Sequence, residues 1–263
     1  MTELAASPAA RRDPERWLAP GQATTWELAR VVAAQREDAA TTLQLRLPTA
    51  PDVLPGQYYL VRMAIGTRPF AVEQAYSLSS SPYPASDEVE ITVRALAGGR
   101  ASPLLAHEVE PGDLLQVRGP YGFLTWTEHD GGPLLLIGGG SGVAPLVSIV
   151  RYAAARVVEV PMTLLCSSRD RSSALLRKEI AELADRHPWF DVVHTFTRSP
   201  WDPYARYHRR IDPLMLADML AGSRAGVPDA SYVAGPGDMV LSVTSALGEL
   251  GIAASSIFSE DHA

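Results

Sequence analysis

Residues 134–145 read LLLIGGGSGVAP and decide the fold of the second half of the chain. A short apolar strand runs into a glycine turn, and a helix begins directly after it. Glycines let a backbone take positive φ and approach a bulky anion, and a helix N-terminus offers free N–H groups to a pyrophosphate. The spacing fits neither the GxGxxG fingerprint nor a Walker loop. The stretch therefore predicts a phosphate-binding turn, with a purely structural turn as the alternative.

Downstream of this turn, apolar strands alternate with helical segments. That order is typical of a parallel sheet with helices on both faces. The expected strands are Leu134–Ile137, Met162–Cys166, Val192–Phe196, Tyr232–Ala234 and Ile257–Ser259, and the expected helices are Val143–Ala155, Ser173–Asp185, Pro213–Leu220 and Asp238–Leu250.

Upstream of the turn, short runs that alternate apolar and polar residues are separated by Gly, Pro and Asp. Short strands separated by turn residues in this way predict an antiparallel, six-stranded Greek-key β-barrel. The expected strands are Trp26–Val32, Thr41–Leu47, Gln57–Met63, Ala75–Ser79, Val89–Arg94 and Leu114–Arg118. The change of pattern predicts a mobile tail over residues 1–22, a barrel domain over 23–127 and an α/β domain over 128–263.

Composition narrows the function classes. The net charge of −7 disfavours a nucleic-acid partner. Cys166 is the single cysteine, so the chain needs no oxidising compartment and cannot supply the ligands of an iron–sulfur cluster. Residues 131–150 carry no charge, but their glycines and two prolines disfavour a membrane-spanning helix. The N-terminus lacks the pattern of a signal peptide, and we expect a cytoplasmic protein.

Two further motifs lie in the barrel half. Tyr76–Ser77 places an aromatic ring and a hydroxyl where they could stack a flat ligand and bond its polar edge, although a plain strand end is the alternative. After Gly98–Gly99, Ser102 is the expected N-cap of a short helix with Pro103 at its first position. That helix start is either a second anion site or an ordinary capped helix.

Taken in order, these pieces resemble the ferredoxin–NADP⁺ reductase family, which includes the reductase components of bacterial oxygenases. The family pattern runs Arg-x-Tyr-Ser, Gly-x-x-Ser, Gly-Pro-aromatic-Gly, the glycine turn, Cys-Gly-Pro and a Glu near the C-terminus. The matching residues here are Tyr76–Ser77, Gly99 with Ser102, Gly119–Gly122, Gly138–Pro145, Gly235–Pro236 and Glu260. The resemblance covers residues 24–263.

The resemblance implies that residues 23–127 bind FAD and residues 128–263 bind NAD(P)H. Tyr76 would stack on the isoalloxazine ring, Ser77 would bond near flavin N5, and Glu260 would lie beside the site of hydride transfer. The implied cofactor-binding residues are Gln74, Leu78 and Ser79 beside Tyr76–Ser77, Gly99 and Ser102 at the flavin pyrophosphate, Gly139, Gly140, Ser141 and Gly142 at the nucleotide pyrophosphate, and Gly235 and Pro236 beside the nicotinamide.

Two positions depart from the family pattern. Gln74 stands where the family has an arginine for the flavin phosphate, and a neutral amide cannot replace that forked, charged contact. FAD is then held more weakly, or another arginine such as Arg68 or Arg94 substitutes. Ala234 replaces the cysteine that lies against the nicotinamide, which predicts slower hydride transfer.

The ends of the second and third strands of the α/β half bear on the choice of nucleotide. Ser167, Arg169 and Arg198 would offer hydroxyl groups and cations to a 2′-phosphate, which favours NADPH, whereas Asp170 leaves NADH open. The histidines show no metal-ligand spacing, and we expect no metal site. The basic run Arg206–Arg210 is either a solvated loop or a docking patch for an acidic electron carrier.

The sequence thus predicts a flavoprotein reductase that takes hydride from NAD(P)H and passes electrons to a separate ferredoxin or oxygenase component. An electron-relay subunit of a larger complex and a non-catalytic, degenerate module are the alternatives. Neither nucleic acid nor a membrane span is expected.

Overall fold

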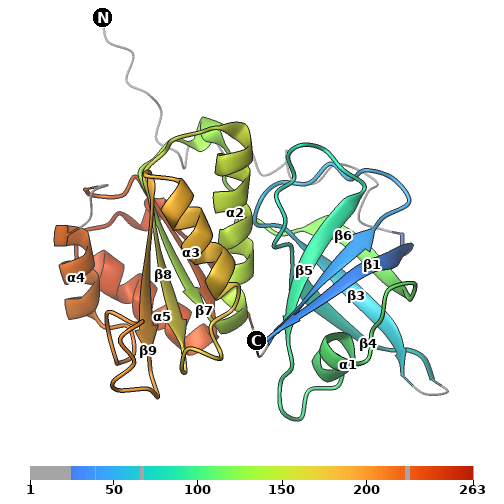
Figure 1. Cartoon of the computed structure of the whole chain (residues 1–263). Coiled ribbons are helices and arrows are strands. Elements are labelled where there is room, and N and C mark those ends of the chain that lie inside the picture. Colours follow the sequence, from blue (N-terminus) through green and yellow to red (C-terminus); the bar gives the residue numbers. More distant parts are fainter. Residues whose placement is uncertain (1–24, 39, 66–67, 223–225, 263) are drawn as a thin grey trace, which may run out of the picture.

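The computed structural model describes residues 25–38, 40–65, 68–222 and 226–262, which form two sheets lying side by side (Figure 1). The first sheet is antiparallel with the order β4-β3-β6-β1-β2-β5, and the second is parallel with the order β11-β10-β7-β8-β9. Both predicted fold classes are confirmed. The predicted tail over residues 1–22 lies outside the described residues.

The antiparallel sheet closes into a barrel. Its two edges meet where Leu78 forms a bridge with Ile91 and the Ser79 amide donates to the Glu90 carbonyl oxygen at 2.9 Å. Alternate residues of each strand fill the interior, as Leu43 and Leu45 of β2 do. The strands are β1 (Glu27–Glu37), β2 (Ala40–Arg46), β3 (Tyr58–Ile65), β4 (Arg68–Ser77), β5 (Glu88–Arg94) and β6 (Leu114–Tyr121).

β4 begins well before its predicted start at Ala75. It pairs with β3 from Ile65 opposite Arg68 to Tyr58 opposite Ser77, so ladder hydrogen bonds hold this segment extended. Glu73 and Gln74 interrupt the apolar alternation along it, and the sequence pattern therefore hid the first part of the strand.

The parallel sheet carries helices on both faces, as its continuous apolar strands require. Along β7, Leu134 and Leu136 pack beneath α2 and α3, whereas Leu135 and Ile137 pack against α4 and α5. The strands are β7 (Leu134–Gly139), β8 (Met162–Ser168), β9 (Phe190–Phe196), β10 (Ala230–Gly235) and β11 (Ile257–Asp261), and the helices are α2 (Val143–Arg156), α3 (Arg177–Arg186), α4 (Pro213–Gly222) and α5 (Gly237–Glu249).

α3 begins at Arg177, later than the predicted Ser173. Asp170 accepts hydrogen bonds from the Ser173 amide at 2.9 Å and from the Ser172 hydroxyl at 2.8 Å, which holds a turn there. Leu176 then adopts a left-handed backbone with φ of 53°. A right-handed helix cannot include that residue, so it starts one position later.

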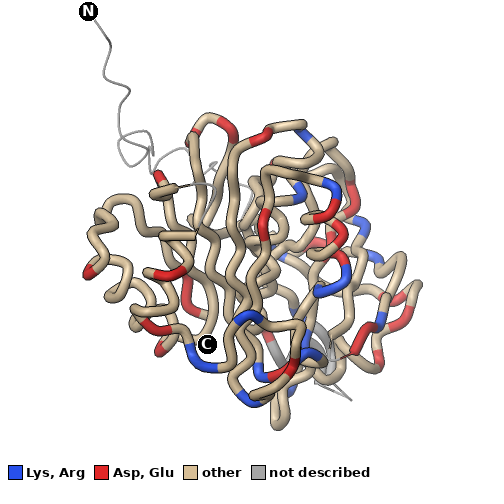
Figure 2. The backbone as a smooth tube through the Cα atoms, turned by 60° about the vertical axis from the view of Figure 1, so that its left-hand side comes forward, with Lys and Arg blue, Asp and Glu red and all other residues tan. Residues whose placement is uncertain are grey.

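Helix α2 lies on the face of the parallel sheet nearest the barrel (Figure 1). Acidic and basic residues are interspersed along the same surface segments in the view of Figure 2. Among the described residues, no helix has the length and apolar character needed to cross a membrane.

Candidate active site

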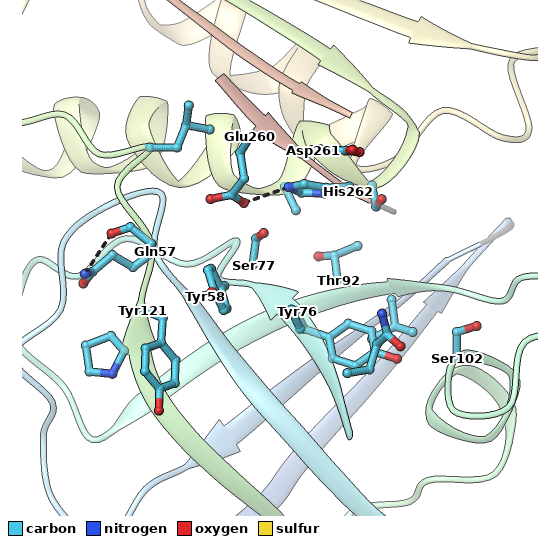
Figure 3. A pocket seen from close by; sticks show the side chains of 18 of the residues that line it. Gln57, Tyr58, Tyr76, Ser77, Thr92, Ser102, Tyr121, Glu260, Asp261 and His262 are labelled. Atoms are coloured by element: carbon cyan, nitrogen blue, oxygen red, sulfur yellow. Dashed lines mark hydrogen bonds and ion pairs between the residues drawn. The ribbon is translucent and has the colours of Figure 1, made fainter. Parts of the chain in front are cut away.

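A cavity of about 1050 Å³ lies between the barrel and the end of β11 (Figure 3). The barrel contributes Tyr58, Tyr76 and Ser77, and the α/β half contributes Ser141 and Glu260. Small-molecule pockets commonly measure about 300–1,000 Å³, so this cavity is large enough for a cofactor with a substrate. Of the sequence-predicted site residues, Gln74, Tyr76, Ser77, Gly99, Ser102, Ser141 and Glu260 line it.

Tyr76 lines this cavity and carries a buried hydroxyl with no hydrogen-bond partner among the described residues. The residue lies on β4 opposite Tyr59 and packs against the barrel core. Burial raises the pKa of Tyr76 to about 12, which keeps the hydroxyl protonated. A buried donor without a partner is rare, and a polar ligand in the cavity would satisfy it.

Leu78 and Ser79 turn away from the cavity. Leu78 belongs to the barrel core. The Ser79 hydroxyl accepts a hydrogen bond from Thr92 Oγ1 at 3.0 Å and is fully buried. These two side chains close the barrel, and only their backbone could contact a flavin.

Ser102 does not cap the short helix α1 (Ser102–His107) as predicted. The N-cap position belongs to Ala101, and Ser102 is the first helical residue. Its hydroxyl instead accepts a hydrogen bond from the Leu96 amide at 3.2 Å, which fastens the preceding loop. A Cβ atom at Gly99 would lie 2.8 Å from that hydroxyl, so the loop requires a glycine there.

The predicted strand, glycine turn and helix are confirmed, and the structure explains two of the glycines separately. A Cβ atom at Gly142 would lie 2.2 Å from the Ala234 carbonyl oxygen, so the turn rests directly on the backbone of β10. Gly140 has a φ of +56°, and a Cβ atom there would lie 3.1 Å from Arg94 Nη2. The glycine at 142 is thus required by packing, and the one at 140 faces a cation.

Arg94 is an unpaired cation between the two halves of the molecule. It ends β5 and lines the cavity, and its side chain has no hydrogen bond or ion pair with any described residue. Burial and the charge of Arg169 lower the pKa of Arg94. An arginine beside a glycine turn, without a counter-charge among the described residues, favours an anionic ligand. The side chain of Arg68, the other candidate replacement for the missing arginine, lies outside the described side chains.

Ser167, Arg169 and Arg198 lie together outside the cavity. The Arg198 amide donates to the Arg169 carbonyl oxygen at 2.7 Å, which joins the segments that follow β8 and β9. Both arginine side chains are exposed, and Ser167 is half-buried. Asp170 is engaged with Ser172 and Ser173, and these hydrogen bonds lower the pKa of its carboxyl group.

The C-terminal strand places Glu260 at the cavity. β11 pairs with β10 so that Glu260 lies opposite Ala234, and the His262 amide donates to the Gly235 carbonyl oxygen at 2.9 Å. Gly235 ends β10 and Pro236 follows it, and neither residue lines the cavity; Ala234 is fully buried. Figure 3 shows Glu260 and His262 facing the barrel strands.

Sequence reasoning missed His262, Tyr58 and Tyr121, all of which line the cavity. The Tyr58 and Tyr121 rings have centroids 5.8 Å apart. Burial and the nearby groups of Glu260 and Tyr121 raise the pKa of Tyr58. Tyr121 lies in the Gly-Pro-aromatic-Gly turn and carried a usable signal, whereas His262 and Tyr58 stand in segments without one.

The basic run Arg206–Arg210 is partly neutralised. Arg206 pairs with Asp218 at 2.9 Å, and Arg209 pairs with Asp212 at 2.6 Å. These ion pairs reduce the positive potential that the run presents to a partner.

Known families match both halves of the chain. The oxidoreductase FAD-binding domain matches residues 32–126, and the oxidoreductase NAD-binding domain matches residues 136–245. Flavohemoprotein of Bordetella pertussis is 29% identical over 251 residues, covering 90% of this chain and 60% of that protein. The ferredoxin reductase component of 3-ketosteroid-9-alpha-monooxygenase from Rhodococcus rhodochrous is 30% identical, covering 87% of this chain and 63% of that protein. The chain thus spans 60–63% of these relatives.

Solved structures agree with this architecture. A cytochrome P450 reductase from Amycolatopsis superposes with a TM-score of 0.77 at 26% identity, covering 90% of this chain and 69% of that one. The FAD/NAD-binding domain of nitric oxide dioxygenase from Vibrio cholerae superposes with a TM-score of 0.79, covering 90% of this chain and 98% of that one. Its identity of 21% shows a shared fold alone.

Proposed function

The chain belongs to the ferredoxin–NADP⁺ reductase family of oxidoreductases with FAD-binding and NAD-binding domains, and from that premise we propose that it transfers hydride from NAD(P)H to FAD and then passes electrons to a separate protein. The domain limits we propose are residues 23–127 for FAD and 128–263 for NAD(P)H.

The shared cavity is the observation that carries this proposal. Tyr76 and Ser77 of the barrel line the same space as Ser141 and Glu260 of the α/β half. Hydride transfer requires donor and acceptor atoms about 3–3.5 Å apart, so the two ligands must meet in one water-poor space. A single cavity with walls from both halves supplies that arrangement.

The barrel residues fit a flavin. Tyr76 would offer its ring face and its unpaired hydroxyl, Ser77 a hydroxyl at the reactive edge, and the Gly99–Ser102 loop its backbone amides to the pyrophosphate. Arg94 would supply the positive charge that Gln74 lacks, because it lines the cavity without a partner among the described residues. FAD, when bound, accepts two electrons as hydride and can release them singly.

The α/β residues fit a nicotinamide dinucleotide. Backbone amides of Gly139, Gly140, Ser141 and Gly142 would hold its pyrophosphate at the start of α2. Gly235 and Pro236 would flank the nicotinamide, with Glu260 beside the reacting atoms.

We assign NADPH as the preferred donor. Arg169 and Arg198 are exposed, are brought together by a backbone hydrogen bond and carry no ion pair among the described residues. A 2′-phosphate would satisfy both cations. The Asp170 carboxylate, which would serve the 2′-hydroxyl of NADH, already accepts hydrogen bonds from Ser172 and Ser173.

The acceptor is proposed as a ferredoxin or an oxygenase component, in keeping with relatives such as the reductase component of the naphthalene 1,2-dioxygenase system of Pseudomonas putida. Cys166 is the single cysteine of these 263 residues and is fully buried, so they do not contain the thiolates of an iron–sulfur cluster.

The test is anaerobic titration of the FAD-loaded protein with NADPH and with NADH, followed by cytochrome c reduction with and without candidate ferredoxins over a salt series. Loss of the yellow colour and a ferredoxin-dependent rate are expected. A yellow protein that neither nucleotide bleaches would instead be a relay subunit, and a colourless protein that binds no FAD would be a non-catalytic module.

A further inference from the structure

Helix α2 contacts the barrel at Ser79 and Ser80. These residues end the short segment 78–80 after β4, which we call the flavin-side segment. The Ser148 hydroxyl donates to the Ser80 carbonyl oxygen at 2.6 Å, and Arg151 Nη1 donates to the Ser79 carbonyl oxygen at 2.7 Å. Ser148 is fully buried, and the Arg151 side chain is 19% exposed. These carbonyl groups follow Tyr76–Ser77 closely along the chain, so the contact lies next to the proposed flavin site.

Arg151 is held by carboxylates from both halves of the molecule. Its Nη1 atom donates to Glu90 Oε2 of β5 at 2.6 Å, its Nη2 atom donates to Glu179 Oε2 of α3 at 2.6 Å, and its Nε atom donates to Glu179 Oε1. Burial alone would lower the pKa of Arg151, but the two carboxylates outweigh it and raise that pKa. A planar guanidinium with partners on β5, on α3 and in the segment after β4 fixes both distance and orientation.

The barrel side of this contact is itself held by hydrogen bonds. Glu90 accepts at its carbonyl oxygen from the Ser79 amide at 2.9 Å, and its own amide donates to the Ser80 hydroxyl at 3.0 Å. Glu90 therefore holds the segment after Ser77 with its backbone and Arg151 with its side chain. A displacement of α2 would pull directly on the closure of the barrel.

The other end of α2 carries the proposed nucleotide site. Gly140–Gly142 precedes the helix, and Ser141 and Ala144 line the cavity. Val143 and Arg151 are about 12 Å apart along the axis at 1.5 Å per residue. One continuous helix thus joins the glycine turn to the flavin-side segment (Figure 1).

We propose that Ser148 and Arg151 are positioning residues that set the separation between the flavin and the nicotinamide, an inference that rests on the proposed function. Neither residue lines the cavity, so neither would touch the reacting atoms. Their effect arises because hydride transfer tolerates little misplacement: a shift of about 1 Å can cost roughly a hundredfold in rate.

A second contact between the halves provides a matched control. Lys178 of α3 pairs with Glu37 of β1 at 3.5 Å, and their side chains are 61% and 55% exposed. Exposed ion pairs contribute little and are screened by salt. Neither residue lines the cavity, and neither bonds to Ser148, Arg151 or their partners, so loss of this pair should leave the separation of the two sites unchanged.

The experiment compares the FAD-loaded parent with Arg151→Gln, Arg151→Lys, Ser148→Ala and Lys178→Gln. Stopped-flow reduction over a range of NADPH concentrations separates the limiting rate from the nucleotide Kd. Arg151→Gln is expected to lower the limiting rate about tenfold or more, with both FAD content and nucleotide Kd within about twofold of the parent. Arg151→Lys should recover part of the rate, Ser148→Ala should show a smaller loss, and Lys178→Gln should match the parent.

A readout without turnover accompanies the rates. A reduced nicotinamide stacked on oxidised FAD gives a long-wavelength charge-transfer absorbance, and the analogue 1,4,5,6-tetrahydro-NADP, which cannot donate hydride, reports this stacking without turnover. Arg151→Gln should weaken that absorbance while the analogue still binds. An unchanged limiting rate and absorbance overturn the proposal, as does a loss of rate that only follows a loss of FAD. If Arg151→Gln does not fold, Ser148→Ala decides, because it removes a single hydrogen bond. A parent that binds FAD but is reduced by neither nucleotide refutes the proposed function first, and this inference with it.

Discussion

The Nε2 atom of His262 lies 3.0 Å from the Oε1 atom of Glu260, and both side chains line the cavity between the two sheets. The Glu260 Oε2 atom lies close to Gly122: a Cβ atom added at Gly122 would be 3.5 Å from it. The carboxylate is thus held by the imidazole of His262, the residue directly after its strand, and faces the barrel across the cavity.

Glu260 is expected to act on hydride transfer more than on flavin binding. Departure of hydride leaves positive charge on the nicotinamide, which a nearby carboxylate stabilises. Glu260→Gln and Glu260→Ala should keep the yellow colour but slow flavin reduction on the order of a hundredfold, as loss of one preorganised electrostatic contact does. Stopped-flow reduction measures this. An unchanged rate in both variants would remove Glu260 from the site.

Tyr76 is expected to bind flavin through both its ring and its hydroxyl. Tyr76→Ala should weaken FAD binding by about 1.5 kcal/mol, roughly tenfold in Kd, because a stacked aromatic face is lost. Tyr76→Phe separates the two contributions. In the FAD-free protein it removes a buried, unpaired hydroxyl and should not lower Tm, whereas FAD binding should still weaken. Equal FAD affinity in the parent and in Tyr76→Ala would refute the stacking assignment.

Arg169 is expected to distinguish the two nucleotides. Arg169→Ala should raise KM for NADPH about tenfold to a hundredfold, the effect of losing a charge-assisted contact of roughly 1.5–3 kcal/mol. KM for NADH should change little, because NADH lacks the 2′-phosphate. Steady-state kinetics with both nucleotides measure the difference, and Arg186→Ala, on an exposed part of α3, serves as the control. Equal effects on both nucleotides would contradict the assignment.

Gly142 is expected to tolerate no side chain. The Cβ atom of Gly142→Ala would lie 2.2 Å from a backbone carbonyl oxygen of β10, which cannot move aside as a flexible side chain would. We expect a loss of about 3 kcal/mol, with a fall in Tm of roughly 5–10 °C. Gly248→Ala is the control: it lies in α5 with no atom within 4 Å of the added Cβ and should stabilise by about 0.5–1 kcal/mol. A Tm for Gly142→Ala equal to that of the parent would show that the turn does not rest on β10.

Glu128 is expected to give a pH-dependent contribution to stability. Burial alone raises its pKa, but hydrogen bonds from Tyr152 and Arg156 outweigh burial and lower it to about 2 from 4.5. A carboxyl group whose pKa is lowered on folding stabilises the protein above its unfolded pKa, and this contribution is lost as the pH falls through the folded value.

The difference in Tm between the parent and Glu128→Gln should therefore be full above about pH 5 and decline towards pH 2. Thermal melts of both proteins across this range measure it, and the subtraction removes the other carboxyl groups. A difference that stays constant with pH would show that Glu128 is not held as a charged partner of Arg156.

The sequence was sufficient to predict both sheets, because period-two alternation and buried apolar runs are local signals. It predicted the glycine turn for the same reason. It could not predict that β4 extends back to Arg68, since that strand depends on pairing with β3. It also placed Ser102 at the N-cap, because the competing hydrogen bond to the Leu96 amide depends on a loop conformation that the residue types do not specify.

Site residues that belong to a sequence motif were predictable, whereas those brought to the site by tertiary packing were not. Tyr76, Ser77 and Glu260 stand in recognisable positions and line one cavity. Arg94 lines it as well and was one of two candidates to replace the missing arginine, but its approach to the glycine turn from another sheet was not predictable. His262, which follows a short terminal strand, was missed. Their proximity arises from long-range docking of the two halves, which no local pattern records.

The contact of α2 with the barrel has a consequence for evolution and for engineered chimeras. Ser148 and Arg151 recognise carbonyl oxygens of Ser79 and Ser80, groups that every amino acid provides. The docking contacts themselves therefore place no demand on these two side chains. The demand comes from closure of the barrel, where the Ser80 hydroxyl accepts from the Glu90 amide, and from the Glu90 carboxylate that Arg151 needs. A graft that joins this barrel to a foreign nucleotide-binding half would have to preserve one serine and one arginine at these helical positions, and need not match the barrel residue for residue.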